Sequence, residues 1–246
     1  MSEPSFDTEG LFDEDYLHFY AEMLGDERSD AEVERIWNLL ALEPGMEVLD
    51  LACGHGRIAN RLATRGCRVT GLDATPLFLD RARGDAAGRG VRVDYVQGDM
   101  RELPWTGRFD RVVNWFTSFG YFNDAGNRRV LAQVAQALRP SGRFALEVQH
   151  RDWIVGALLP AVLVERDGDL LVDRNRFDPL TGTIVTERII ARDGRVRRVP
   201  FFTRLFGFTE LRDWLLQAGF ATVDAYGEDG ASLSPASRRL LAVARR

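Results

Sequence analysis

The sequence predicts an α/β fold, in which a doubly wound parallel sheet with helices on both faces is interrupted by a small antiparallel β insertion. Strand and helix patterns alternate five times between residues 46 and 152, which is typical of parallel strands joined by right-handed crossovers. From about residue 160 the hydrophobic period changes from helical to two, as in consecutive hairpins. The 246 residues fit one compact domain with an insertion.

The first half of the chain alternates between helical patterns and short apolar runs. Residues 1–45 are polar-rich and have helical spacing throughout. Strands are expected at 47–51, 68–72, 91–96, 109–115 and 143–148, and helices at 58–63, 77–87 and 127–138. In such sheets ligands bind at the carboxyl ends of the strands.

The second half begins with the insertion, residues 153–204. Its strands are expected at 162–165, 170–175, 183–191 and 196–202, with Asp-Gly or Thr-Gly turns between them. The arginines at 192, 195, 197 and 198 are interpreted as a solvated hairpin face. A helix at 209–218, with Thr209 as its N-cap, and strands at 220–226 and 239–244 then complete the α/β core.

The composition excludes several kinds of chemistry. All 32 basic residues are arginine, so Schiff-base and pyridoxal enzymes and lysine-containing phosphate loops are excluded. Three histidines and two cysteines do not form a zinc-spaced cluster, so no metal is expected and the cysteines are read as free thiols. The net charge of −5 argues against nucleic acid or an anionic membrane as partner.

Polar residues close the predicted strands of the core. They are Asp50, Asp73, Asp99, Asn114 and His150, and all are candidates for one crevice. A glycine-rich turn with the pattern Gly54-x-Gly56-x-x-Ala59 follows the first strand and lets the backbone approach a ligand closely. This pattern also fits the dinucleotide fingerprint, so the glycines alone do not separate NAD from other adenosine ligands.

Asp50 favours a cationic ligand over a dinucleotide. A carboxylate at this position would repel a pyrophosphate and attract an ammonium or a sulfonium. S-adenosylmethionine combines adenosine with a cationic amino acid and therefore suits the crevice. In this interpretation Asp73 takes both ribose hydroxyls, and Asp99 with Met100 holds the adenine.

These motifs resemble those of the class I S-adenosylmethionine-dependent methyltransferases. The order D-x-A-C-G-x-G, G-L-D, G-D-M, F-D-x-V-V and L-R-P-S-G-R carries the resemblance, which runs from about residue 10 to the end. Within the class, the chain is most similar to bacterial small-molecule enzymes of the glycine and aminosugar N-methyltransferase types. The resemblance implies a Rossmann-like sheet of seven strands whose last strand is antiparallel.

The resemblance also implies a division of the chain and of its site. Residues 46–152 and 205–246 would bind the cofactor, residues 1–45 would form a helical lid, and residues 153–204 would cover the acceptor site. The expected cofactor-binding residues are Asp50, Ala52, Gly54, Gly56, Arg57, Asp73, Ala74, Asp99, Met100, Asn114 and Tyr20. Ala52 departs from the commoner glycine, and Arg57 is expected to reach the methionine carboxylate. S-adenosylhomocysteine would be the product.

The acceptor half is expected around residues that border the insertion. Tyr16 and Tyr20 on the lid would flank the sulfonium or the acceptor, and Trp115 and Tyr121 would line an organic acceptor. His150, with Tyr16, is the expected catalytic residue, because an O-methylation needs a base. Arg151 and Arg204 would bind an anionic handle on the acceptor.

Three functional hypotheses remain at this point. The first is methyl transfer to a nitrogen or oxygen of a small organic acceptor. The others are an NAD(P)-type oxidoreductase and a module that binds the cofactor without transfer. With no stretch of 18 apolar residues and no leader at Met1, a cytoplasmic monomer or homodimer is expected.

Overall fold

The computed structural model describes residues 8–246, so residues 1–7 of the predicted lid lie outside the described residues. The core is a seven-stranded sheet with the order β10-β11-β5-β4-β1-β2-β3. Its strands are β1 (Glu47–Leu51), β2 (Arg68–Asp73), β3 (Val93–Gln97), β4 (Phe109–Asn114), β5 (Leu138–Gln149), β10 (Thr222–Tyr226) and β11 (Arg239–Arg245). Strands β1 to β5 are parallel, and β11 is antiparallel to both of its neighbours. The predicted fold class is confirmed, including the antiparallel last strand.

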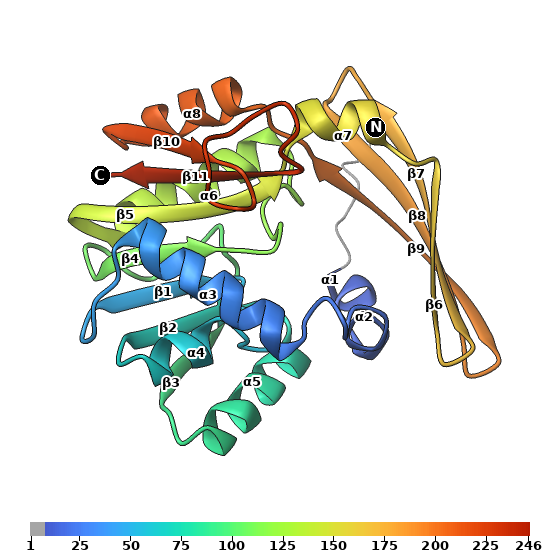
Figure 1. The fold of residues 1–246 in the computed structure, drawn as a ribbon, viewed down its shortest axis with the longest axis horizontal. Coiled ribbons are helices and arrows are strands. Elements are labelled where there is room, and N and C mark those ends of the chain that lie inside the picture. Colours follow the sequence, from blue (N-terminus) through green and yellow to red (C-terminus); the bar gives the residue numbers. More distant parts are fainter. Residues whose placement is uncertain (1–7) are drawn as a thin grey trace.

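Helices cover both faces of this sheet (Figure 1). On one face lie α3 (Asp26–Leu40), α4 (Ala59–Thr64) and α5 (Pro76–Gly88), and on the other α6 (Asp124–Ala137) and α8 (Phe208–Gln217). The sheet is covered on both sides, so β1 and β11 are almost continuously buried. Two hydrophobic clusters follow from this arrangement, one under α3 and α4 and one under α6 and α8.

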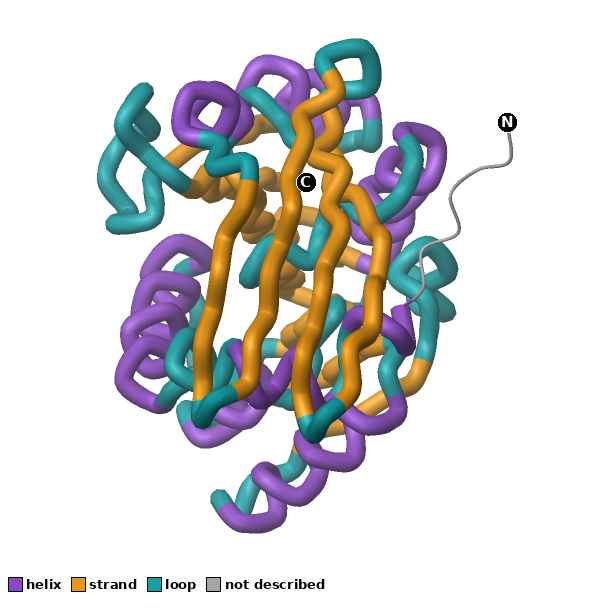
Figure 2. Tube along the Cα trace, turned by 90° about the vertical axis from the view of Figure 1, so that its right-hand side faces the viewer, coloured by secondary structure: helices purple, strands orange, loops and turns teal. Residues whose placement is uncertain are grey.

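The insertion is a four-stranded antiparallel meander with the order β6-β7-β8-β9. Its strands are β6 (Ala161–Arg166), β7 (Asp169–Asp178), β8 (Thr183–Arg192) and β9 (Arg195–Arg204). Figure 2 shows this sheet face on, standing as a separate layer in front of the core. A short helix that the sequence pattern did not predict, α7 (Arg151–Ala157), connects β5 to it.

The N-terminal segment divides into two parts. The short helices α1 (Thr8–Leu11) and α2 (Glu14–Phe19) lie between the core and the insertion (Figure 1), and Asp13 caps α2 by accepting from the Asp15 and Tyr16 amides. Helix α3 packs on the core sheet through Val33, Ile36 and Leu40. The predicted range 1–45 is therefore not one lid, because α3 buries an apolar face against the sheet.

Some element boundaries differ from those predicted. Helix α8 begins at Phe208 after Gly207, so Thr209 lies inside the helix and is not its N-cap. Strand β5 begins at Leu138 rather than 143, because a register shift between Phe109 and Arg111 lets pairing start before the turn. None of the described helices is both long and apolar enough to cross a membrane.

Candidate active site

Two cavities adjoin each other beside the carboxyl ends of the core strands. The first, of about 500 Å³, is lined by the glycine turn and by the residues that follow β1, β2 and β3. The second, of about 360 Å³, is lined by α7, the insertion and the N-terminal helices. Five residues line both and are here called the shared wall: Phe12, Tyr16, Phe116, Ser118 and Tyr121.

The turn after β1 forms the base of the first cavity. Ala52 and Gly54 both have positive φ angles, 57° and 54°, and both line the cavity. A Cβ on Gly54 would meet only Phe78, at 3.9 Å, so its backbone is open toward a ligand. A Cβ on Gly56 would lie 2.3 Å from the Tyr95 hydroxyl, so Gly56 allows close packing and does not line the cavity, contrary to its predicted role.

Asp73 organises the backbone of this turn. One carboxylate oxygen accepts from the Gly54 amide and the other from the Thr75 amide, both at 2.8 Å. Burial raises the pKa of Asp73, and the amides of Thr75 and Gly54 oppose this shift. Each oxygen has a second lone pair, so the carboxylate can still accept from ligand hydroxyls. Ala74, the next residue in the chain after Asp73, also lines the first cavity.

Asp50 and Asn114 each carry a buried oxygen without a hydrogen-bond partner among the described residues. Asp50 lines the first cavity, and burial raises the pKa of its carboxyl to about 7, with partial opposition from the Arg57 guanidinium. Asn114 does not line the cavity, and its amide donates to the Leu51 carbonyl at 2.8 Å. The orphaned carboxylate oxygen of Asp50, which does line the cavity, fits a cationic donor such as an ammonium.

Arg57 supplies the opposite charge. Its Nη1 lies 2.5 Å from Glu32 of α3, and its guanidinium packs over the Phe116 ring at 4.9 Å. Its Nη2 is buried without a partner among the described residues, and the side chain lines the first cavity. An orphaned donor close to an orphaned carboxylate suits the two ends of a zwitterionic amino acid.

The far end of the first cavity is formed by Asp99, Met100 and Arg101. Arg101 pairs with Asp99, its Nε lying 3.0 Å from Oδ2. Partial burial alone would raise the pKa of Asp99, but the Arg101 guanidinium outweighs it and holds that pKa below its usual value. The carboxylate therefore stays ionised beside an apolar neighbour, as expected for a residue that accepts from an adenine amine.

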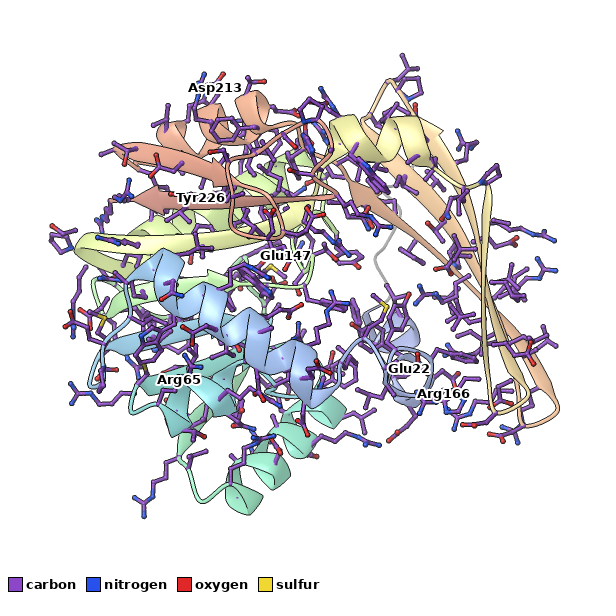
Figure 3. All side chains as sticks on the ribbon, in the orientation of Figure 1. Glu22, Arg65, Glu147, Arg166, Asp213 and Tyr226 are labelled. Atoms are coloured by element: carbon purple, nitrogen blue, oxygen red, sulfur yellow. The ribbon has the colours of Figure 1, made fainter. Side chains whose placement is uncertain are left out.

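Four of the five residues of the shared wall are aromatic, and the backbone is strained at Phe116 and at its neighbour Thr117. Phe116 and Thr117 have φ angles of 60° and 59°, which non-glycine residues rarely adopt. Phe116 N donates at 3.2 Å to Glu147, a buried carboxyl of β5 (Figure 3), which helps to hold this conformation. Burial raises the pKa of Tyr121 to about 12 and raises that of Tyr16 well above its usual range, so both phenols stay protonated.

The wall of the second cavity on the insertion side is polar where an ordinary sheet face would be apolar. Arg188 of β8 binds Asp173 of β7 through two hydrogen bonds of 2.8 and 2.7 Å, and donates to the Tyr20 hydroxyl at 2.7 Å. The Thr186 hydroxyl donates to Asn175 at 2.9 Å. Tyr20 lines only this second cavity, so the structure places it on the acceptor side rather than on the predicted cofactor side.

His150 does not lie where a base was expected. It is buried and lines neither cavity, and its Nδ1 lies 2.9 Å from the Ser237 carbonyl. The residue pairs with Phe206 in a parallel bridge at the start of α7, which turns its ring toward the loop before β11. The sequence predicted its position at the end of β5 but not this rotation away from the site.

Arg151 and Arg204 also line neither cavity. Arg204 is buried beneath the insertion, where it pairs with Asp124 and Glu210 and lies 4.9 Å from the Phe206 ring centre. Arg151 lies 3.2 Å from Asp152 on the surface of α7. Both predicted acceptor roles are corrected, because Arg204 joins the insertion to the core and Arg151 pairs with its neighbour on α7.

The arginine-rich hairpin is only partly solvated. Arg197 binds Asp13 at 2.5 Å and Asp15 at 2.6 Å, and Arg192 binds Asp15 at 3.0 Å. We call these four residues the clamp, because they join the N-terminal helices to the insertion. Arg198 points to the other face and binds Glu187. The predicted solvated face is thus correct for Arg198 and wrong for Arg192 and Arg197.

Several residues of the site were missed from the sequence. They include Phe12, Glu32, Phe78, Glu147, Gln149, Asp173, Asn175, Thr186, Arg188 and Arg239. A signal was available for some of them. Glu147 interrupts an otherwise apolar strand, and Asp173, Asn175, Thr186 and Arg188 occupy alternate positions on two paired strands, where a buried sheet face is normally apolar.

Comparison with known proteins agrees with this geometry. Residues 48–142 match the family described as methyltransferase domain. Within these residues the chain is therefore similar to a methyltransferase domain. This segment contains the glycine turn, Asp73 and Asp99, so the resemblance to S-adenosylmethionine-dependent methyltransferases that the motifs predicted is confirmed, and the cofactor expected from that resemblance is S-adenosylmethionine.

One sequence relative and one solved structure illustrate how much of the chain is similar to known proteins. An uncharacterised methyltransferase of Synechocystis is 37% identical over 118 residues, which cover 47% of this chain and 53% of that protein. The alignment thus spans about half the length of this curated relative. An S-adenosylmethionine-dependent methyltransferase from Clostridium acetobutylicum has a TM-score of 0.77 at 16% identity, covering 94% of this chain and 97% of the other.

An amino pentose methyltransferase from Micromonospora echinaspora, solved with S-adenosylmethionine bound, shares the fold of this chain over nearly its whole length. Its TM-score is 0.67 at 23% identity, covering 97% of this chain and 99% of the other. At these identities the similarity is one of fold, including the insertion.

Proposed function

We propose that this protein transfers a methyl group from S-adenosylmethionine to a nitrogen or oxygen of a small organic acceptor. The observation that carries the proposal is the pair of orphaned buried groups in the first cavity, Asp50 Oδ2 and Arg57 Nη2. They complement the ammonium and the carboxylate of the methionine end. Asp73 and Asp99 then suit the ribose and the adenine.

The chain's own residues would act by binding, orienting and excluding water. When bound, the cofactor would supply an electrophilic methyl carbon on its sulfonium; the acceptor would attack that carbon in line as the sulfur–methyl bond breaks and S-adenosylhomocysteine leaves. The shared wall borders both cavities, so its residues can hold the two reacting groups at the contact of about 3 Å that such a displacement needs. Phe12, Tyr16 and Tyr121 surround this junction with aromatic rings that keep water out.

A nitrogen acceptor has more support than an oxygen acceptor. No histidine lines the second cavity among the described residues, and Tyr16 and Tyr121 stay protonated. The carboxylate there, Asp173, already accepts two hydrogen bonds from Arg188. An amine that arrives neutral needs no base, whereas a hydroxyl must lose a proton. The similarity in fold to an amino pentose methyltransferase points in the same direction.

The test is incubation of the protein with methyl-labelled S-adenosylmethionine and a pool of candidate metabolites, followed by mass spectrometry. One labelled product is expected, and its fragmentation identifies the methylated atom.

Asp73→Ala should lose S-adenosylhomocysteine affinity, while His150→Ala should retain it. If both variants bind S-adenosylhomocysteine like the wild type, the assignment of the cofactor site is wrong. Binding without any labelled product would favour a cofactor-binding module instead.

A further inference from the structure

The floor of the second cavity holds two buried polar atoms that lack partners among the described residues. They are Nη1 of Arg239 and Oε1 of Gln149, and both side chains line the cavity. The two residues face each other across β5 and β11 as register partners. One orphan is a donor and the other an acceptor. A buried polar group without a partner is unfavourable, so this floor fits a ligand group that both accepts and donates.

The charge of this floor is already balanced. Arg239 Nε lies 3.6 Å from Oε1 of Glu147, whose other oxygen accepts from Phe116 N. A carboxylate on the acceptor would be attracted by Arg239 but would be buried close to Glu147. An ammonium would satisfy Gln149 but would be buried close to Arg239. Neither ion finds an uncompensated partner here.

The charges on the insertion side of the second cavity are balanced as well. Its charged residues, Asp173 and Arg188, neutralise each other through two hydrogen bonds, and Arg188 also donates to Tyr20. Among the described residues that line the second cavity, the charges are therefore one carboxylate and two guanidiniums, and Glu147 compensates the second guanidinium.

We propose that Gln149 and Arg239 select the acceptor by an uncharged group that both donates and accepts a hydrogen bond, such as a hydroxyl, and that the second cavity discriminates against anionic acceptors. This inference rests on the proposed function, since it assigns the second cavity to the acceptor. It replaces the anion-binding role that the sequence predicted for Arg151 and Arg204. An acceptor amine would likewise enter in its neutral form.

The test compares three probes of equal size that differ in one group: benzyl alcohol, benzoate and benzylammonium. Their affinities are measured by ligand-detected NMR with the full-length protein saturated with S-adenosylhomocysteine, at pH 8 to favour ionised Glu147. Benzyl alcohol should bind at least about tenfold more tightly than either ion, since burying an unpaired charge is costly. Equal or tighter binding of benzoate, or binding of none of the three, overturns the proposal.

A variant that removes the negative charge of Glu147 provides a second test of the same inference. Glu147→Gln keeps an oxygen that accepts from Phe116 N but leaves Arg239 uncompensated. Benzoate affinity should then rise at least about tenfold, while that of benzyl alcohol changes by less than about threefold. Glu187→Gln is the matched control, because Glu187 pairs with Arg174 and Arg198 away from the cavities and should change nothing. Unchanged benzoate binding in Glu147→Gln contradicts the inference.

The measurement separates this inference from the proposed function. If S-adenosylhomocysteine binds but the three probes show no preference, the acceptor inference fails and the cofactor assignment stands. If S-adenosylhomocysteine does not bind to the wild-type protein, the proposed function itself fails.

Discussion

Asp50 illustrates how one residue couples burial to ligand charge. Its carboxyl would have a pKa of about 3.8 in water, and burial raises this pKa to about 7 in the protein. A raised pKa means that the folded state holds a proton that the unfolded state has lost. The stability of the free protein should therefore fall as pH rises from about 4 through 7. A cationic ligand reverses the preference, because it stabilises the ionised carboxylate.

S-adenosylhomocysteine affinity should consequently rise by about tenfold between pH 6 and pH 8, as Asp50 loses its proton without cost to binding. Calorimetry in two buffers of different ionisation enthalpy should detect proton release near pH 6. Asp50→Asn should show weaker binding that is independent of pH in this range. An equally steep pH dependence in Asp50→Asn would show that another group titrates.

Ala52 stores strain in the turn after β1. Its φ angle of 57° lies in the left-handed region, which costs an L-residue about 1–2 kcal/mol. Ala52→Gly removes this strain and adds about 0.5–1 kcal/mol of unfolded-state entropy. We expect a net stabilisation of about 0.5–1 kcal/mol, measured by urea unfolding. Ala74→Gly is the control, since the φ of Ala74 is not positive, and it should destabilise. Destabilisation by Ala52→Gly would argue that the methyl group packs favourably.

At the scale of elements, the clamp makes α2 and the insertion one unit. Asp13 and Asp15 at the start of α2 meet Arg192 and Arg197 at the end of the insertion sheet. Tyr16 and Tyr20, stacked with ring centres 4.7 Å apart, project from the same segment between the cavities. The clamp therefore holds the segment that carries both tyrosines against the insertion sheet.

Arg197→Ala should loosen α2. Partly exposed ion pairs contribute roughly 1 kcal/mol or less each, so amide hydrogen exchange in residues 14–20 should accelerate by about fivefold. Arg198→Ala is the matched control, because Arg198 is the next residue in the chain but its side chain binds Glu187 on the other face of the sheet. Equal exchange rates in the wild type and in Arg197→Ala would show that apolar packing alone holds the helix.

At the scale of the whole molecule, cofactor binding should stabilise the entire α/β core. S-adenosylhomocysteine at 100 times its Kd adds about 2.7 kcal/mol to the free energy of unfolding. For a chain of this size the increase in Tm should be about 5–10 °C. NADH at the same concentration should leave Tm unchanged, because its pyrophosphate would lie against Asp50. A shift with NADH alone would favour the oxidoreductase hypothesis.

The cofactor half was far more predictable than the acceptor half. Each of these residues lies near the carboxyl end of a strand or in the turn that follows it, so a few consecutive residues define its position: Asp50, Gly54, Asp73 and Asp99. Asn114 and Gly56 were predicted on the same basis, but packing turned them away from the cavity. Even within such units, the spacing of residues predicts that a residue lies near the cavity better than it predicts whether its side chain points into it.

Local sequence patterns predict the α/β order, the period-two insertion and the acids of the first cavity, because each depends on local periodicity and on the edge where parallel strands end. The acceptor side depends instead on contacts between residues far apart in the chain. The partners Gln149 and Arg239 are 90 positions apart and meet through the antiparallel pairing of β5 and β11. His150 and Arg204 were turned into structural contacts by the same long-range packing, which local sequence patterns do not encode.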